Sequence, residues 1–98
     1  MAGLDFLNTL EGIIQDRLND LPPDSYTARI AAGGELLAAK KLAEEAAEVV
    51  LAAVAESPAR LTEESADLLY HLLVLLRMRE LSLESVVAEL QSRHHPQG

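Results

Sequence analysis

The chain has 98 residues, no cysteine and a formal net charge of −8, so it forms one small domain without disulfides or thiolate metal sites. The acidic balance argues against binding to a nucleic-acid backbone, which requires clustered Lys and Arg. Apolar residues make up 49% of the chain and aromatic residues only 3%. This composition, dominated by Leu, Ala and Val, favours helices over strands.

The first expected helix covers residues 4–20, and two prolines in the segment LPPDS end it. A short helical turn is expected in residues 24–34, ending at Gly33 and Gly34, where glycine permits a left-handed cap. The first helix should present one apolar stripe to a partner helix, because apolar residues recur there every three or four positions. That stripe contains Leu4, Leu7, Leu10, Ile14 and Leu18.

Two long helices and a final short one follow. Nothing interrupts a helix from Glu35 to about Glu56, and the next helix is expected from Thr62, as its N-cap, to Glu80. Glu63 and Glu64 would then lie in the first turn of that helix, where the helix dipole favours negative charge. The last helix is expected from a Ser82 cap to about residue 92.

These elements predict an all-α fold, a four- to five-helix bundle in a single domain of residues 1–93 with a flexible tail at 94–98. Because so short a chain buries little apolar surface, we expect dimerisation to complete the bundle. The most apolar run, residues 68–76, is too short to span a bilayer, and no signal peptide is visible at the N-terminus. The sequence therefore predicts a soluble cytoplasmic protein without a membrane or nucleic-acid partner.

Acidic residues gather on the two long helices. One carries Glu44, Glu45 and Glu48, and the next carries Glu64 and Asp67. Spacings of three and four place each set on one helix face, and a short connection makes the two helices antiparallel neighbours. Apolar residues surround Asp67 nearly all the way round its helix, which predicts burial. Buried carboxylates that share a space require cations, and Mg²⁺ with oxygen ligands is the commonest solution.

A simpler interpretation remains open for these acidic residues. They would form a solvated face with local ion pairs, such as Lys40–Glu44 and Lys41–Glu45. His71 lies four residues after Asp67, so we expect an Asp–His hydrogen bond that satisfies a buried histidine. Tyr70, beside it, is expected to pack in the core or in an interface.

Five segments together resemble the phosphoribosyl-ATP pyrophosphohydrolase family, which belongs to the all-α (MazG-like) nucleotide pyrophosphohydrolases. The paired acidic pattern alone would indicate only that superfamily, whereas ADLLYHLLVLL with SYTA upstream is typical of the specific family. The resemblance covers nearly the whole chain in the expected order, without the cyclohydrolase domain that is fused to this enzyme in some organisms. The segments are SYTARI (25–30), KKLAEEAAE (40–48), EESADLLYHLLVLL (63–76), VVAEL (86–90) and RH (93–94).

The resemblance implies an enzyme of histidine biosynthesis that hydrolyses phosphoribosyl-ATP to phosphoribosyl-AMP and pyrophosphate. It implies a homodimer and Mg²⁺, which would neutralise charge on the polyphosphate and polarise the attacking water. The resemblance also implies that Glu44 and Glu45 are catalytic residues. Glu44 would be a further metal ligand or would orient that water. The resemblance further implies Mg²⁺ ligands at Glu45, Glu48, Glu64 and Asp67, and substrate contacts at Lys41, Ser25, Tyr26 and Thr27.

Two positions depart from the family pattern. Leu37 stands where the family usually has Lys, and Ala43 stands where it usually has Gly. These differences leave open a related hydrolase that acts on dUTP or another non-standard nucleotide. A helical interaction module without catalysis, whose acidic faces are solvated, is the alternative from outside the enzymes.

Overall fold

The computed structural model describes residues 3–94, and this part of the chain contains five helices and no strand. The all-α prediction is therefore confirmed. The expected flexible tail lies mostly outside the described residues, since only His94 of it is described. The helices are α1 (Phe6–Asp20), α2 (Tyr26–Ala32), α3 (Gly34–Ala55), α4 (Pro58–Met78) and α5 (Leu83–Arg93).

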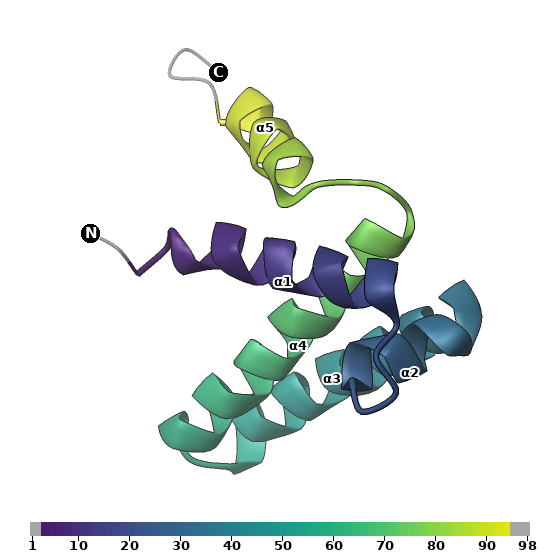
Figure 1. Ribbon diagram of the computed structural model, residues 1–98. Coiled ribbons are helices and arrows are strands. Elements are labelled where there is room, and N and C mark those ends of the chain that lie inside the picture. Colours follow the sequence, from purple (N-terminus) through teal and green to yellow (C-terminus); the bar gives the residue numbers. More distant parts are fainter. Residues whose placement is uncertain (1–2, 95–98) are drawn as a thin grey trace.

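The core lies where α1 and α2 cover the α3–α4 pair, with α1 crossing α4 (Figure 1). Most of the predicted apolar stripe of α1 faces this core, because Ile14 is buried and Leu7, Leu10 and Leu18 pack against it. Leu4, by contrast, precedes the first residue of the helix and is exposed. The fully enclosed centre of the cluster consists of Ile14, Ile30, Ala38, Leu73 and Val74.

The long helices α3 and α4 lie antiparallel and side by side, joined by a short turn (Figure 1). The expectation that α4 begins at Thr62 is wrong. Ser57 is the N-cap, and its Oγ accepts a hydrogen bond from the Arg60 N–H at 3.2 Å. Pro58 is the first helical residue, where the missing proline N–H costs nothing and the fixed φ suits a helix. Glu64 therefore lies in the second turn of α4, not the first.

The turn between α2 and α3 depends on two adjacent glycines. The predicted left-handed glycine occurs at Gly34, with φ of 84°, whereas Gly33 has a right-handed φ of −83°. The side chain of Leu37 lies over Gly33, so that a Cβ added to Gly33 would collide with it. This close approach fixes the entry of α3 against α2.

Helix α5 lies apart from the α3–α4 pair (Figure 1) and contains no buried residue. Leu83 packs at the edge of the core, and its N–H donates to a carboxylate oxygen of Glu11 at 2.7 Å. Farther along the helix, Val87 is exposed and Leu90 retains 50% of its accessible surface. The radius of gyration, 14.9 Å, exceeds the value of about 13 Å typical of a compact 100-residue domain, consistent with a helix that stands off the body.

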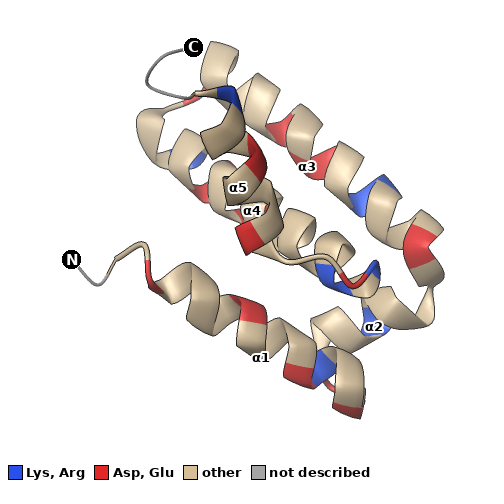
Figure 2. Ribbon diagram, turned by 90° about the horizontal axis from the view of Figure 1, so that it is seen from above, with Lys and Arg blue, Asp and Glu red and all other residues tan. Residues whose placement is uncertain are grey.

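Charge is distributed unevenly between signs, with 16 acidic and 8 basic residues in the chain. Figure 2 shows acidic segments along α1 and α3 and on α5, with basic segments on α1 and α3 as well. Within residues 3–94, none of the helices combines the length and apolar character needed to cross a membrane.

Candidate metal centre

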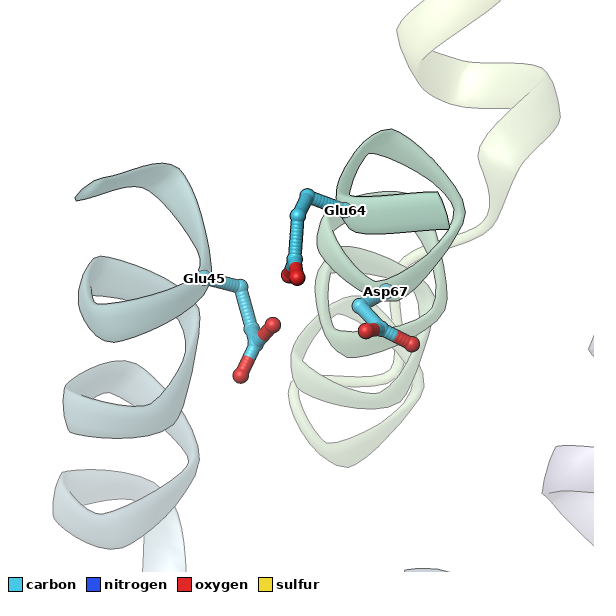
Figure 3. Close-up of side chains that lie close together, drawn as sticks. All are labelled: Glu45, Glu64 and Asp67. Atoms are coloured by element: carbon cyan, nitrogen blue, oxygen red, sulfur yellow. The ribbon is translucent and has the colours of Figure 1, made fainter. Parts of the chain in front are cut away.

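Three carboxylates converge between α3 and α4. Glu45 projects from α3 toward Glu64 and Asp67 on α4 (Figure 3), and one oxygen of each lies within 4.8 Å of the others. Because the two helices are antiparallel neighbours, the acidic face predicted on α3 lies opposite the acidic face predicted on α4. Of the four metal ligands expected from the family resemblance, these three lie together.

The three side chains differ in exposure. Glu64 is 7% exposed, Glu45 is half-buried and Asp67 is exposed. The expectation that Asp67 is buried is wrong for the single chain. Apolar neighbours along α4 predicted its burial, but α1 and α2 cover only the side of α4 that carries Leu73 and Val74.

The pKa of Glu64 is raised above its ordinary value. Burial of the carboxyl is the main cause, the charges of Glu48, Asp67 and Glu45 add to it, and the Arg60 guanidinium opposes it. The negative charge of Glu64 is therefore only partly compensated by Arg60.

Arg60 was not singled out by the sequence analysis. Its guanidinium contacts Glu64 and Glu63 on α4, and its Nε lies 3.4 Å from an oxygen of Glu56. The spacing of four residues from Arg60 to Glu64 was a usable signal, because side chains at i and i+4 meet on a helix. The Arg60 side chain is 49% exposed, and it shares its charge with two surface glutamates besides the buried one.

Glu48 and Glu44 lie outside the three-carboxylate group. Both are exposed, although the charge of Glu48 contributes to the raised pKa of Glu64. Within the described residues, neither of the expected pairs Lys40–Glu44 and Lys41–Glu45 forms. Instead, Lys41 Nζ lies 3.7 Å from a carboxylate oxygen of Glu44, three residues later.

The substrate-side residues expected from the family resemblance form the start of α2. Ser25 is the N-cap, and its Oγ accepts a hydrogen bond from the Ala28 N–H at 3.1 Å. Thr27 is buried, and its hydroxyl is hydrogen-bonded to that of Tyr70 on α4. The hydroxyls of Ser25 and Thr27 are therefore engaged within the protein, as is that of Tyr26, which bonds to His71.

Tyr26 reaches from α2 to the helix that carries the acidic residues. Its hydroxyl lies 2.7 Å from Nε2 of His71, whose Nδ1 lies 2.7 Å from the backbone carbonyl oxygen of Asp67. The expected bond between His71 and the Asp67 side chain is wrong, because the carbonyl one turn earlier on the helix takes that place. Burial raises the pKa of Tyr26, Lys41 opposes this, and Glu45 and Asp67 add to it. The Tyr26 hydroxyl therefore lies in the field of the acidic group.

A hollow of about 900 Å³ lies elsewhere, between α1, the start of α3 and the end of α4. Glu35 and Arg77 in its lining are each about 15 Å along their helices from the acidic group. The candidate site thus rests on the chemistry of converging side chains on the α3–α4 pair. The full lining is Gln15, Leu18, Asn19, Gly34, Glu35, Arg77, Met78 and Glu80.

Comparison with known proteins gives one consistent result. Residues 7–94 match the family profile described as phosphoribosyl-ATP pyrophosphohydrolase. A phosphoribosyl-ATP pyrophosphatase from Rhizobium johnstonii is 50% identical over 98 residues, which cover 100% of this chain and 91% of the relative. Those from Metallosphaera sedula and Pyrobaculum islandicum are each 49% identical over 89 residues, covering 91% of this chain and 96% and 95% of the relatives.

Proposed function

The chain belongs to the phosphoribosyl-ATP pyrophosphohydrolase family, and we propose that it hydrolyses phosphoribosyl-ATP to phosphoribosyl-AMP and pyrophosphate in histidine biosynthesis. Relatives named for this activity match at about half of all positions along nearly their full lengths, which supports the same substrate here. The observation that carries the mechanism is the convergence of Glu45, Glu64 and Asp67. A biosynthetic hydrolase of this kind would act in the cytoplasm.

We assign Glu45, Glu64 and Asp67 as ligands of Mg²⁺, with Glu48 as the fourth. The donor set fits this ion, because Mg²⁺ prefers hard oxygen ligands and is bound through carboxylates together with substrate phosphates. The raised pKa of the buried Glu64 supports the same assignment, since Arg60 alone does not offset the burial and the neighbouring negative charges. When bound, Mg²⁺ would neutralise charge on the polyphosphate and polarise a water.

The remaining polar residues of α2 and α3 have separate proposed roles. Lys41 supplies positive charge to phosphate oxygens, and Glu44, its ion-pair partner, orients the attacking water. Tyr26 makes the substrate-side contact at the start of α2, because this residue keeps 39% of its accessible surface exposed. Ser25 and Thr27 hold the first turn of α2 in place through their bonds within the protein.

The two departures from the family pattern have structural roles in this chain. Leu37 covers Gly33 in the turn between α2 and α3, so its apolar side chain is used in packing. Ala43 is exposed in the interior of α3, where alanine favours the helix over glycine by about 1 kcal/mol. Neither residue requires a different substrate.

We further propose that the protein acts as a homodimer in which α5 packs against the partner. An isolated helix of 11 residues is marginal in water, and α5 has no buried residue of its own. Its apolar residues recur at the spacing of one helix face, and the single chain leaves two of them, Val87 and Leu90, exposed. A second copy would bury this face.

Pyrophosphate release by the purified protein in Mg²⁺ tests the proposed function. Phosphoribosyl-ATP should be turned over selectively when it is offered beside dUTP, dCTP and ATP. Turnover of dUTP or dCTP in preference would contradict the substrate while leaving a hydrolase. No turnover of any nucleotide would favour a helical interaction module instead.

A further inference from the structure

His71 is a buried histidine that joins two elements of the site. It is 6% exposed, lies one turn after Asp67 on α4 and reaches Tyr26 at the first position of α2. Both ring nitrogens have partners at 2.7 Å, the Asp67 carbonyl oxygen at Nδ1 and the Tyr26 hydroxyl at Nε2. None of the roles that the family resemblance implies falls on this histidine.

The partners of His71 assign its tautomer. A backbone carbonyl oxygen can only accept, so Nδ1 of His71 must carry a proton and donate it to Asp67. In a neutral imidazole the other nitrogen then has a lone pair and no proton. Nε2 consequently accepts, and the hydroxyl of Tyr26 must donate its one proton to it.

The position of the Tyr26 ring is set independently of this bond. The ring stacks on Tyr70 with centroids 6.3 Å apart and meets the His71 ring edge-on at 5.5 Å. The guanidinium of Arg29, which also belongs to α2, lies 5.8 Å from the centroid of the Tyr26 ring. What the bond to His71 decides is therefore the direction of the hydroxyl proton, which points to Nε2 of His71.

We propose that His71 is a positioning residue that makes the Tyr26 oxygen an acceptor-only contact for an O–H donor, either a ribose hydroxyl of the substrate or a water. Phosphate oxygens are themselves acceptors and find no proton on a hydroxyl so engaged. The phosphates are left to Lys41 and the metal ligands, while Tyr26 recognises the sugar or holds water. This inference rests on the proposed function. It adds that, in the contact made by Tyr26, the substrate or a water donates the hydrogen bond and the Tyr26 oxygen accepts it.

A double-mutant cycle tests the coupling. Tyr26→Phe removes the acceptor, and His71→Phe keeps the ring volume but removes the group that holds the hydroxyl proton. Each should lower kcat/KM for phosphoribosyl-ATP by about ten-fold, the size of one hydrogen bond, and the double variant should lose no more than the worse single one. His71→Gln should restore most of the loss, because its amide oxygen can accept from Tyr26. Effects that multiply, or a His71→Gln variant no better than His71→Phe, would overturn the proposal.

The split between kinetic constants distinguishes the two donors. A ribose hydroxyl bound in the ground state predicts that Tyr26→Phe chiefly raises KM, whereas a water predicts that it chiefly lowers kcat. Unchanged KM and kcat would refute the contact altogether. Tyr70→Phe is the matched control, because this neighbouring hydroxyl bonds to Thr27 and not to His71. Because the Tyr70 hydroxyl takes no part in the bond between Tyr26 and His71, the coupling between Tyr26→Phe and His71→Phe should persist in a Tyr70→Phe background.

A spectroscopic measurement separates this inference from the proposed function. In the ¹⁵N-histidine NMR spectrum of the whole protein, His71 should appear as the neutral tautomer with its proton on Nδ1, whichever substrate the enzyme takes. A proton on Nε2, or on both nitrogens at neutral pH, would overturn the inference even if the wild type hydrolyses phosphoribosyl-ATP. A wild type inactive on phosphoribosyl-ATP would instead remove the proposed function while leaving the tautomer to be tested.

Discussion

The α3–α4 pair and α5 are both amphipathic and helical, yet of the two the single chain buries apolar residues only on the α3–α4 pair. α3 and α4 pack along their lengths, enclose Ala38, Ala52 and Leu73, and hold three carboxylates together at their junction. α5 buries none of its residues and keeps Leu90 half exposed. The single chain thus brings the three carboxylates together by itself, whereas it leaves the apolar face of α5 uncovered, where we propose that a partner packs.

Removing one carboxylate from the α3–α4 pair should have the largest effect. Glu64→Gln is expected to lower kcat/KM on the order of 100-fold or more, because even residues behind metal ligands cost 10- to 100-fold when they are changed. The same variant should lose the rise in melting temperature that Mg²⁺ gives the wild type. Glu63→Gln is the matched control, since Glu63 is its exposed neighbour and also contacts Arg60. Equal losses in both variants would indicate that Glu64 acts through its ion pair with Arg60 and does not bind a metal.

A charge placed on the apolar face of α5 should weaken the proposed homodimer. Leu90→Asp is expected to weaken the homodimer by at least about ten-fold, because a buried Leu is worth roughly 1.5–3 kcal/mol. Analytical ultracentrifugation over a range of concentrations measures this. Gln91→Asp adds the same charge at the next, exposed position and should leave the dimer intact. A Leu90→Asp protein that dimerises like the wild type would show that α5 does not contact a partner.

The metal-free protein should lose stability as the pH rises through the raised pKa of Glu64. Burial and neighbouring charges raise the pKa of Glu64 in the folded chain, so between its unfolded and folded pKa values the folded state binds more protons. Stability from this group is complete below the unfolded pKa and declines above it. Thermal melts in chelator at several pH values should therefore fall less steeply for Glu64→Gln than for the wild type and Glu63→Gln. Parallel curves for all three would contradict the assigned cause.

The smallest expected effect concerns where α4 begins. Ser57→Ala removes the N-cap bond and should cost about 1 kcal/mol, or roughly 4–8 °C in melting temperature. Thr62→Ala should change stability by less than about 0.5 kcal/mol, because the Thr62 hydroxyl only donates back to the Pro58 carbonyl inside the helix. A larger loss of stability in Thr62→Ala than in Ser57→Ala would indicate that Thr62, not Ser57, is the N-cap.

Periodicity and punctuation predicted much of the fold. The spacing of Ile14 and Leu18 identified the buried face of α1, and the glycine pair located the turn before α3. The start of α4 was expected at Thr62 and missed at Ser57, because proline often interrupts helices although it is also a favoured first residue of a helix. Local pattern does not distinguish these two uses of proline.

The candidate site was predictable as far as spacing along a helix determines it. Spacing placed Glu45 opposite the α4 carboxylates, but it could not show that Asp67 is open to solvent, since that depends on where α1 and α2 pack. The partner of His71 was missed for a different reason. A side chain and a backbone carbonyl compete for the same ring nitrogen, and only the three-dimensional arrangement decides between them.

Paramagnetic NMR would show whether the carboxylates between α3 and α4 hold a divalent metal, as we propose. Mn²⁺, which shares the oxygen ligands of Mg²⁺, would be titrated into ¹⁵N-labelled protein. We expect backbone signals around Glu45, Glu64 and Asp67 to broaden first, while those of α5 remain sharp. Broadening spread over all the acidic helices, or centred elsewhere, would show that these three carboxylates do not form the metal site.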